Sequence, residues 1–300
     1  MSHNVRLEQI TRHLDAKFNI QNIPPDMPFS KVMPRIYDAE EIEFKKYLTD
    51  SFTQSFHGLM IKNLGEIYRV YLSVFLSKEI LDKIFAKNGK GGLIFSHHPM
   101  EMETSNRGFL PLPEEYFQEI QKRDIAVYVL HTPLDIHEDI STSQSIAKKL
   151  KLKNCQRYKR HSIGYEGISG ELPEKKNFED FIPILRKLFG VEEIHFIKRF
   201  NNIHRVGIIA GGGADVEYIK ETIRLGCDTY LSGDYENKIK NEYSLQKRKE
   251  FEEVKDVLQI NLIECSHYAT EKVVMINEIK ELFEGYGLHV AFIEQDNAWY

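Results

Sequence analysis

The sequence predicts an α/β protein with two lobes built around mixed sheets. Apolar runs of strand length alternate with stretches whose apolar residues recur at helical spacing, which is the pattern of strand-helix-strand units. The chain has 300 residues, near the length at which one hydrophobic core divides into two. We therefore expect a first α/β lobe over residues 1–154 and a second over residues 155–300.

The composition narrows the class of protein. With 42% hydrophobic and 28% charged residues, neither a disordered nor a fibrous chain is expected. A net charge of -5 argues against a large nucleic-acid surface. No apolar run approaches the roughly 20 residues that span a bilayer, and Met1–Ile10 lacks the apolar core of a secretory signal. Three widely spaced cysteines without a C-x-x-C pair suit free thiols, so we expect a cytoplasmic protein without a membrane partner.

The elements of the first lobe follow from apolar periodicity and from its prolines and glycines. Helical spacing at the start of the chain ends at a cluster of prolines, and two strand-helix-strand units come after it. In order, we expect a helix over 7–18, a loop over 24–28, a peripheral helix or loop outside the core over 34–54, a strand over 66–77, a helix over 78–87, a strand over 93–95, a polar loop over 100–110, a helix over 113–122, a strand over 125–130, and a helix capped by Ser141 or Ser143.

The second lobe is expected to begin with a turn-rich stretch over 155–182, because glycines recur at positions 164, 167 and 170. Farther on, a strand, a run of three glycines, a helix and another strand predict a βαβ-like unit with a right-handed crossover. In order, we expect a helix over 181–189 closed by Gly190, a strand over 206–210, a helix over 216–225, a strand over 229–232, a charged helix within 235–255, a strand over 258–264, a helix from 267, and a closing strand over 288–293.

Two adjacent histidines, His97 and His98, directly follow the predicted strand over 93–95. Ligand chemistry in α/β sheets gathers at the carboxyl ends of strands, so this pair is a candidate metal site. Neighbouring strand residues point to opposite faces. Both imidazoles can therefore serve one site only if the strand has ended, or if two metal ions lie on either side of it. The simpler alternative is that the pair belongs to a polar loop.

Further candidate ligands follow the other predicted strands. His267 and Glu271 are spaced i, i+4, so they share one helix face and can reach one metal or bridge two. Asp135 offers a carboxylate after another strand, and the mixed nitrogen and oxygen set suits zinc, iron or manganese. Each residue also has a structural explanation: Asp135 as a turn-former, His267 as a core histidine, and Glu271 as a first-turn helix charge.

Four spaced blocks resemble those of a known family, the Nif-like dinuclear-metal-centre hexamers, which are homologues of a type-2 GTP cyclohydrolase I. The blocks are Ile94–Pro99 (IFSHHP), His131–Asp135 (HTPLD), Gly207–Asp215 with Asp228–Asp234 (DTYLSGD), and Ser266–Glu271 (SHYATE). The resemblance covers roughly residues 60 to 293. It implies a Nif-like fold, a homo-hexameric ring, and two divalent transition-metal ions.

The resemblance also implies roles for single residues. The metal ligands would be His97, His98, Asp135, His267 and Glu271, with Glu271 bridging the ions and His131 beside them. Five ligands shared by two ions leave coordination positions for water, whereas a structural zinc site is normally closed by four protein ligands.

We therefore favour a metal-dependent hydrolase over a non-catalytic metal-binding scaffold or regulatory protein. A metal-activated water would attack a nucleotide, a phosphoester or a cyclic amide, with His131 as the proton shuttle. Gly211–Gly213 could cradle a phosphate, but we favour a tight turn because the P-loop and dinucleotide patterns are both incomplete.

Overall fold

The computed structural model of the chain describes residues 5–63, 65–87 and 89–296. Contacts divide these residues into two compact units, and each is described by itself. Unit 1 takes the described residues of Met1–Glu103, Phe109–Leu134 and Met275–Asp296, and unit 2 takes those of Thr104–Gly108 and Asp135–Val274. Among the described residues, no helix combines the length and the apolar character that crossing a membrane requires.

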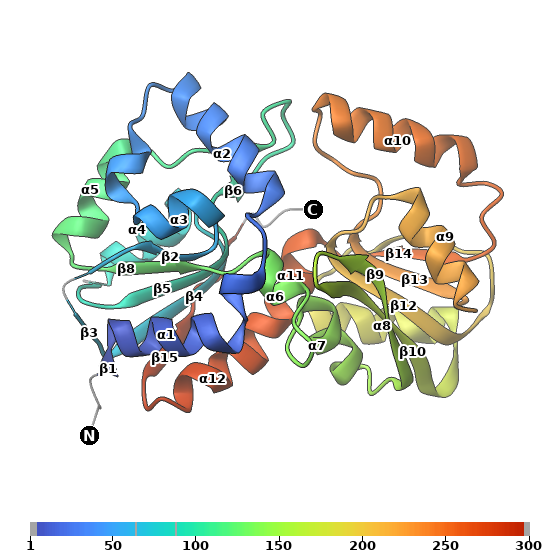
Figure 1. Cartoon of the computed structure of the whole chain (residues 1–300). Helices are drawn as coiled ribbons and strands as arrows, with labels where there is room; N and C mark the ends of the chain where they lie inside the picture. The colour runs from blue at the N-terminus through green and yellow to red at the C-terminus, as the bar shows by residue number, and fades with distance from the viewer. Residues whose placement is uncertain (1–4, 64, 88, 297–300) are drawn as a thin grey trace. The chain divides into compact units, whose positions relative to one another are not determined.

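Unit 1 is built around a five-stranded sheet (Figure 1). Its helices in chain order are α1 Leu7–Lys17, α2 Met27–Ala39, α3 Asp50–Ser55, α4 Lys78–Ala86, α5 Glu114–Lys122 and α12 Lys280–Glu284, with 3₁₀ turns η1 Ile20–Asn22 and η2 Phe44–Tyr47 and a π-helical segment η3 Met275–Ile279. Its strands are β1 Val5–Arg6, β2 Gly58–Ile61, β3 Glu66–Ile67, β4 Arg69–Phe75, β5 Leu93–His98, β6 Glu101–Met102, β7 Phe109–Leu110, β8 Ala126–Val129 and β15 His289–Phe292.

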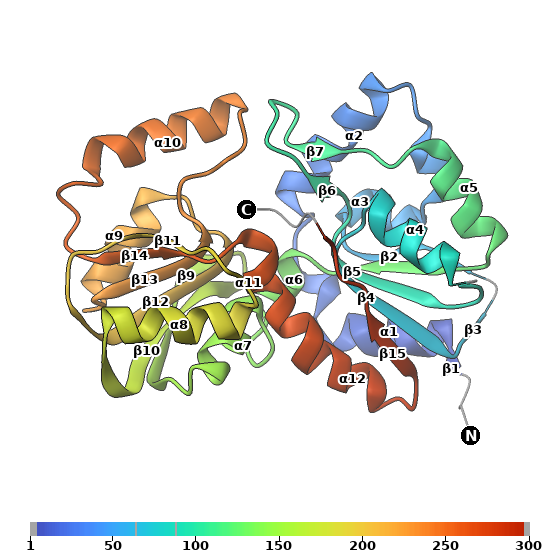
Figure 2. The same cartoon turned by 180° about the vertical axis from the view of Figure 1, so that it is seen from behind.

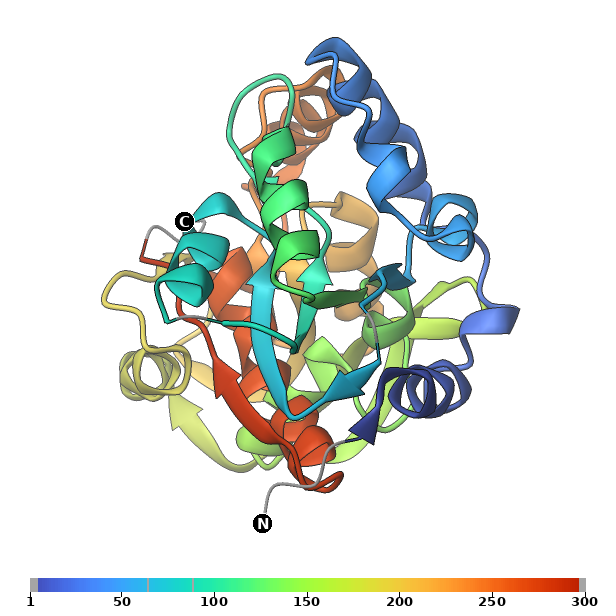
Figure 3. The ribbon, with the colours of Figure 1, turned by 90° about the vertical axis from the view of Figure 1, so that its left-hand side faces the viewer.

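The sheet of unit 1 has the strand order β15-β4-β5-β8-β2. The first four strands are parallel, and β2 runs antiparallel to β8, so the sheet is mixed. The last strand of the chain, β15, pairs with β4, which lies some two hundred residues earlier (Figure 3). This pairing gives β5 a central place in the sheet.

Alternate residues of the central strands enter two different cores. Ile94 and Val127 join an apolar cluster with residues of α2, α4 and α5. On the other face, the ring of Phe95 stacks on Tyr128 with centroids 5.7 Å apart and meets Phe283 of α12 at 5.3 Å. Figure 1 shows α2, α4 and α5 on one side of the sheet and α1 and α12 on the other. Helices on both faces are what a parallel sheet requires.

The stretch over 34–54 was expected outside the core, and this expectation is wrong. Tyr37, Phe44 and Phe52 are fully buried, and the rings of Tyr37 and Phe44 stack at 4.4 Å. The Tyr37 hydroxyl also accepts a hydrogen bond from the Leu112 backbone N–H at 3.0 Å. Short helical turns break the regular spacing of these residues, which is why periodicity did not reveal their burial.

Unit 2 is built on a six-stranded sheet with the order β11-β14-β13-β12-β10-β9 (Figure 2). Its strands are β9 Lys153–His161, β10 Gly164–Asn177, β11 His195–Ile197, β12 Asn202–Gly212, β13 Thr229–Asp234 and β14 Asn261–Glu264. Its helices are α7 Thr142–Lys149, α8 Phe178–Phe189, α9 Val216–Arg224, α10 Glu242–Val254 and α11 His267–Val274, and the short α6 Thr132–Asp135 joins the two units along the chain.

This second sheet is also mixed and has a core on each face. Strands β12, β13 and β14 are parallel, and β9, β10 and β11 are antiparallel to their neighbours. Ile208 and Leu231 pack with α7, α8 and α11, whereas Ile209 and Tyr230 pack with α9 and α10. The prediction of an α/β fold with mixed sheets is confirmed. The division into lobes at residue 154 stays a prediction.

The turn-rich stretch expected over 155–182 is instead a long hairpin of β9 and β10. The three glycines belong to β10, which begins at Gly164, and at each of them neighbouring groups leave little or no space for a side chain. A Cβ at Gly167 would lie 2.7 Å from the Tyr158 ring, and one at Gly164 would lie 2.6 Å from the Ile136 carbonyl oxygen. Glycine therefore signals close packing here, whereas sequence alone suggested turns.

Two smaller differences concern the neighbourhood of the His-His pair. The strand expected over 93–95 continues through His98, and the polar loop expected over 100–110 contains the antiparallel pair β6 and β7.

Ser141 is the N-cap of α7, as one of the two alternatives predicted, because its hydroxyl accepts a hydrogen bond from the Gln144 backbone N–H.

The packing around Gly167 gives a prediction about stability. Gly167→Ala should lower the free energy of unfolding by about 1–3 kcal/mol, because the added methyl group overlaps the buried Tyr158 ring. Urea denaturation measures the change. The control is Gly285→Ala, where the backbone has a helical φ of -61° and the nearest non-neighbouring atom is 3.3 Å away. Equal stabilities of the two variants would contradict the close-packing explanation.

Candidate metal centre

His97 and His98 are the last two residues of β5, the central strand of unit 1. Their side chains are almost completely buried, with 0% and 2% of their surface exposed. Although neighbouring strand residues normally point apart, the two rings stand edge to face, with centroids 4.6 Å apart and planes at 86°. Burying polar imidazoles is unfavourable unless their nitrogen atoms have partners. The nitrogen atoms of these buried rings therefore require hydrogen-bond partners or a bound metal ion.

The orientation of His97 is set by a backbone carbonyl. Its Nδ1 lies 2.8 Å from the carbonyl oxygen of Leu130, which can only accept a hydrogen bond. The proton of a neutral ring is therefore on Nδ1, and Nε2 carries the lone pair. Backbone carbonyls commonly orient metal-binding histidines in this way. The arrangement suits His97 as a ligand through Nε2.

A third imidazole, His131, completes a cluster in unit 1. Its ring centroid lies 5.0 Å from that of His97 and 4.7 Å from that of His98. One nitrogen atom from each of the three rings lies within 4.8 Å of the others. Phe29 and Phe75 pack against these rings and form an apolar wall. A set of three clustered imidazole nitrogens fits a divalent transition metal such as zinc or iron.

A buried carboxylate, Asp26, orients His131. Its Oδ2 accepts hydrogen bonds from His131 Nδ1 at 2.8 Å and from the Thr132 hydroxyl at 2.9 Å. Its Oδ1 caps α2 by accepting from the Phe29 backbone N–H at 3.2 Å. Burial would raise the pKa of Asp26, but the His131 charge and these hydrogen bonds outweigh burial and hold the pKa well below its usual range. Asp26 is therefore ionised and keeps the His131 proton on Nδ1.

In unit 2, His267 and Glu271 lie one turn apart on α11. Nε2 of His267 is 3.0 Å from Oε1 of Glu271, and the two side chains are only 8% and 5% exposed. The i, i+4 spacing thus brings a nitrogen and an oxygen donor together, as the sequence predicted for this segment. Both atoms are ordinary ligands of zinc, iron and manganese.

Gly211 makes room for this pair. A Cβ at Gly211 would lie 2.1 Å from Glu271 Oε1 and 3.1 Å from His267 Nε2, and its φ of +66° also favours glycine. Its backbone N–H donates to the Thr270 hydroxyl at 2.9 Å. The glycine thus lets β12 approach the two candidate ligands, and any larger side chain would displace them.

The glycine run lacks the features of a phosphate cradle. The N–H groups of Gly211 and Gly213 already donate to Thr270 Oγ1 and to the Asp234 carbonyl oxygen. The helix that follows is capped by the carboxylate of Asp215, which would repel an anion there. These contacts favour the close backbone approach over the phosphate alternative.

The structure therefore brings most of the predicted site residues together in two groups, one in each unit. It brings His97 and His98 together with His131 in unit 1, and His267 together with Glu271 in unit 2. Asp135 begins unit 2, and its Oδ1 accepts a hydrogen bond from the Thr142 hydroxyl at 2.8 Å. A single ligand set formed by all five predicted ligands stays a prediction.

Comparison with known proteins matches this chain to one family. The family described as Duf34/NIF3 (NGG1p interacting factor 3) matches residues 45–298. The chain belongs to this family. The family resemblance found in the sequence is thereby confirmed.

Several Duf34/NIF3 relatives align over most of their length. A "GTP cyclohydrolase 1 type 2 homolog" of Deinococcus radiodurans is 29% identical over 225 residues, which is 72% of this chain and 76% of the relative. A protein of the same name from Buchnera aphidicola subsp. Schizaphis graminum is 27% identical over 260 residues, which is 86% of this chain and 97% of the relative.

Solved structures share the fold. The protein described as "Structural genomics, protein ybgI, unknown function" has a TM-score of 0.68 and 16% identity, covering 98% of this chain and 100% of that one. "Reduced HcgD from Methanocaldococcus jannaschii" has a TM-score of 0.63 and 18% identity over the same shares. Similarity at this level of identity establishes the fold alone.

Asp26 is the residue of the site that sequence reasoning missed. It lies before residue 45, where the match to the Duf34/NIF3 family begins, and within a stretch interpreted only as a proline loop. A signal was present, because an aspartate two residues before Pro28 is a typical N-cap at the start of a helix. Its contact with His131 joins residues 105 positions apart and has no local signature.

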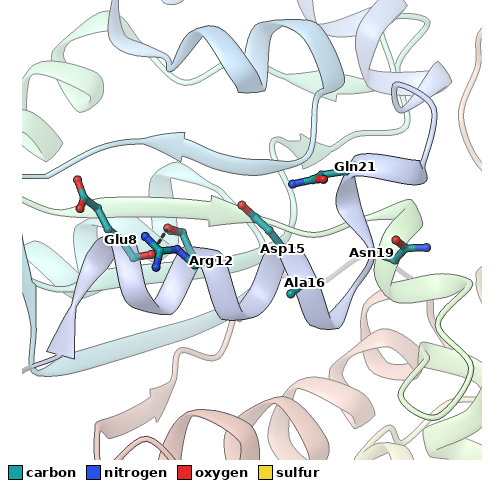
Figure 4. Close-up of a pocket in the computed structure, with 7 residues that line it drawn as sticks. Glu8, Arg12, Asp15, Ala16, Asn19 and Gln21 are labelled. Atoms are coloured by element: carbon teal, nitrogen blue, oxygen red, sulfur yellow. Dashed lines mark hydrogen bonds between the residues drawn. The ribbon is translucent and has the colours of Figure 1, made fainter.

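A polar cavity of about 430 Å³ lies elsewhere in unit 1, beside α1. Its lining, drawn in Figure 4, includes Glu8, Arg12, Asp15, Asn19 and Gln21. Asp15 accepts a hydrogen bond from the Tyr128 hydroxyl at 2.7 Å, and burial raises the pKa of Asp15. No histidine and none of the predicted ligands lines this cavity. The residues that could hold a metal ion are therefore the clustered histidines and the His267–Glu271 pair, and they do not line this cavity.

The role of Asp26 can be tested through stability. Asp26→Asn should lower the free energy of unfolding by about 2–3 kcal/mol, because an amide NH₂ or an uncharged oxygen would replace the acceptor of two buried donors. Thr132→Val is the matched variant, since it removes only one donor to the same carboxylate and should cost about 1 kcal/mol. Urea denaturation at neutral pH compares the variants. An Asp26→Asn protein as stable as the parent would refute the assigned role.

Proposed function

We propose that this chain is a dinuclear metal-binding protein that works as a metal-dependent hydrolase. The main support is the cluster of three imidazoles in unit 1, where a carbonyl orients His97 and a carboxylate orients His131. In unit 2, the pairing of His267 with Glu271 supports these two residues as further ligands. The proposed ligand set is His97, His98, Asp135, His267 and Glu271, with Glu271 as the bridging ligand.

The donor types limit the choice of metal. Imidazole and carboxylate groups suit zinc, iron and manganese, and no thiolate belongs to the set. When bound, two such ions would act as Lewis acids that lower the pKa of a water molecule and polarise the substrate. Five protein ligands leave room for that water, which a closed structural zinc site does not.

We assign proton transfer to His131. Its Nδ1–H is held by ionised Asp26, so Nε2 is the basic atom of the neutral ring. A carboxylate behind a histidine fixes the tautomer of the ring and stabilises its protonated form, as in other hydrolytic sites. His131 would thus accept a proton at Nε2 and return it to the leaving group, with Asp26 as the positioning residue.

The proposed substrate is a nucleotide, a phosphoester or a cyclic amide. The name "GTP cyclohydrolase 1 type 2 homolog" of the relatives supports a nucleotide, and phosphoesters and cyclic amides are attacked by the same chemistry. We do not assign the phosphates to Gly211–Gly213, because two of those N–H groups already have partners. We further propose a cytoplasmic homo-hexamer.

Metal content gives the direct test of the centre. Purified protein should carry up to two transition-metal ions per chain by elemental analysis. Glu271→Gln should lose more metal than His97→Ala, since a bridging ligand serves both ions. Lys240→Ala, at an exposed position, is the control and should keep the parent content. If both ligand variants retained full metal, the proposed ligand set would be wrong.

Turnover is tested separately. Metal-loaded protein is screened against nucleotides, phosphodiesters and cyclic amides, with Asp135→Asn as the blank. Light scattering compares the oligomeric state of the parent and the variant, which we expect to be a hexamer in both. Loss of turnover in the variant at unchanged assembly would support the hydrolase. Equal activity in the variant and the parent would indicate a contaminant. Metal-loaded protein that is inert throughout would favour the metal-binding scaffold.

A further inference from the structure

A small groove of about 200 Å³ opens on unit 2 between the end of α7, β10 and α8. We call it the lysine-rimmed groove. Its charged edge has Lys149, Lys151 and Lys176, and its apolar surface includes Leu172, Phe181 and Ile184. None of the proposed metal ligands lines it, so its role is independent of the proposed hydrolase.

The apolar surface of the groove combines core residues with one exposed side chain. Leu172 and Phe181 belong to the core beneath α8, and they are 6% and 0% exposed. Ile184 lies one turn after Phe181 on the same helix, yet 41% of its surface is exposed. A cavity of about 150 Å³ already accommodates a benzene molecule. The groove therefore has room for one phenyl or branched aliphatic side chain.

The charge around the groove is opposite to that of the chain as a whole. The chain has a net charge of -5, whereas the charged residues that line the groove are three lysines and one glutamate. Within the groove, only Glu174 offsets the three lysines, and its carboxylate lies 3.5 Å from Lys176. The groove thus keeps an excess of positive charge beside an apolar surface.

Ordinary structural roles explain only part of this pattern. Lysine near a helix C-terminus favours the helix dipole, which accounts for Lys149, and lysines on an edge strand such as β9 discourage aggregation. Lys151 is different, because it follows the C-cap of α7 with a φ of +56° at a position where glycine is favoured. Neither role explains why these lysines surround an exposed isoleucine.

We propose that the lysine-rimmed groove binds an acidic peptide segment of a partner protein. One leucine or phenylalanine of the segment would fill the groove against Ile184, and flanking aspartates or glutamates would lie over Lys149, Lys151 and Lys176. The match of opposite charges around an apolar anchor supplies both orientation and affinity. A single-stranded nucleic acid fits less well, because base stacking needs an exposed aromatic face and Phe181 is 0% exposed.

The test uses a fluorescein-labelled peptide with the sequence Gly-Asp-Glu-Phe-Glu-Asp-Gly and the full-length protein, followed by fluorescence polarisation at low salt. Lys151→Glu should weaken binding about five- to tenfold, since it reverses a charge at the edge of the groove. Ile184→Ser should weaken binding about tenfold through lost apolar contact. A peptide with Ser in place of Phe should bind as weakly to the parent protein.

Matched controls come from exposed positions of unit 2 outside the groove. Lys249→Glu repeats the charge reversal and Val257→Ser repeats the loss of an exposed apolar side chain, and both should bind like the parent. Equal binding by Lys151→Glu and Lys249→Glu would overturn the proposal, as would the absence of any binding by the parent. A twelve-nucleotide single strand serves as the alternative ligand. If it bound more tightly than the peptide and Lys151→Glu weakened its binding, the partner would be a nucleic acid and the peptide proposal would be wrong.

Discussion

Unit 1 depends on one unfavourable event, the burial of two imidazole rings at the carboxyl end of β5 and the partial burial of a third just beyond β8. Each ring nitrogen removed from water needs a partner. The Leu130 carbonyl serves His97, and Asp26 serves His131. These partners determine which nitrogen of each ring carries the proton, so they also determine which nitrogen has the lone pair that a metal ion or a proton requires.

The helices that precede the family-matched region complete this arrangement. Asp26 begins α2, and Phe29 of the same helix packs edge-on against His98 and His131. One helix start therefore supplies a charge to the site and an apolar wall beside it. The amino-terminal segment thus contributes to the candidate site as well as to the core.

At two positions of unit 2, a glycine allows the backbone to approach a neighbouring side chain closely. At Gly211 the missing side chain leaves space for Glu271 and His267, and at Gly167 it leaves space for the Tyr158 ring. In neither case does glycine mark a turn. Both lie within strands, where a packed neighbour excludes any Cβ. The same residue type therefore serves ligand placement in β12 and core packing in β10.

By itself the sequence determined the α/β class, most helices, and the strand ends that carry the candidate ligands. These features depend on local periodicity, caps and strand length, and the i, i+4 pairing of His267 with Glu271 is likewise local. Only the tertiary structure decided that β9 and β10 form a long hairpin, that Tyr37 and Phe44 are core residues, and that Asp26 binds His131. The hairpin is a local pairing, but its glycines suggested turns until the close packing around them was seen. For the two core residues and for Asp26 the physical reason is the same. Burial and buried hydrogen bonds depend on partners far away in the chain, which leave no periodic pattern in the residues themselves.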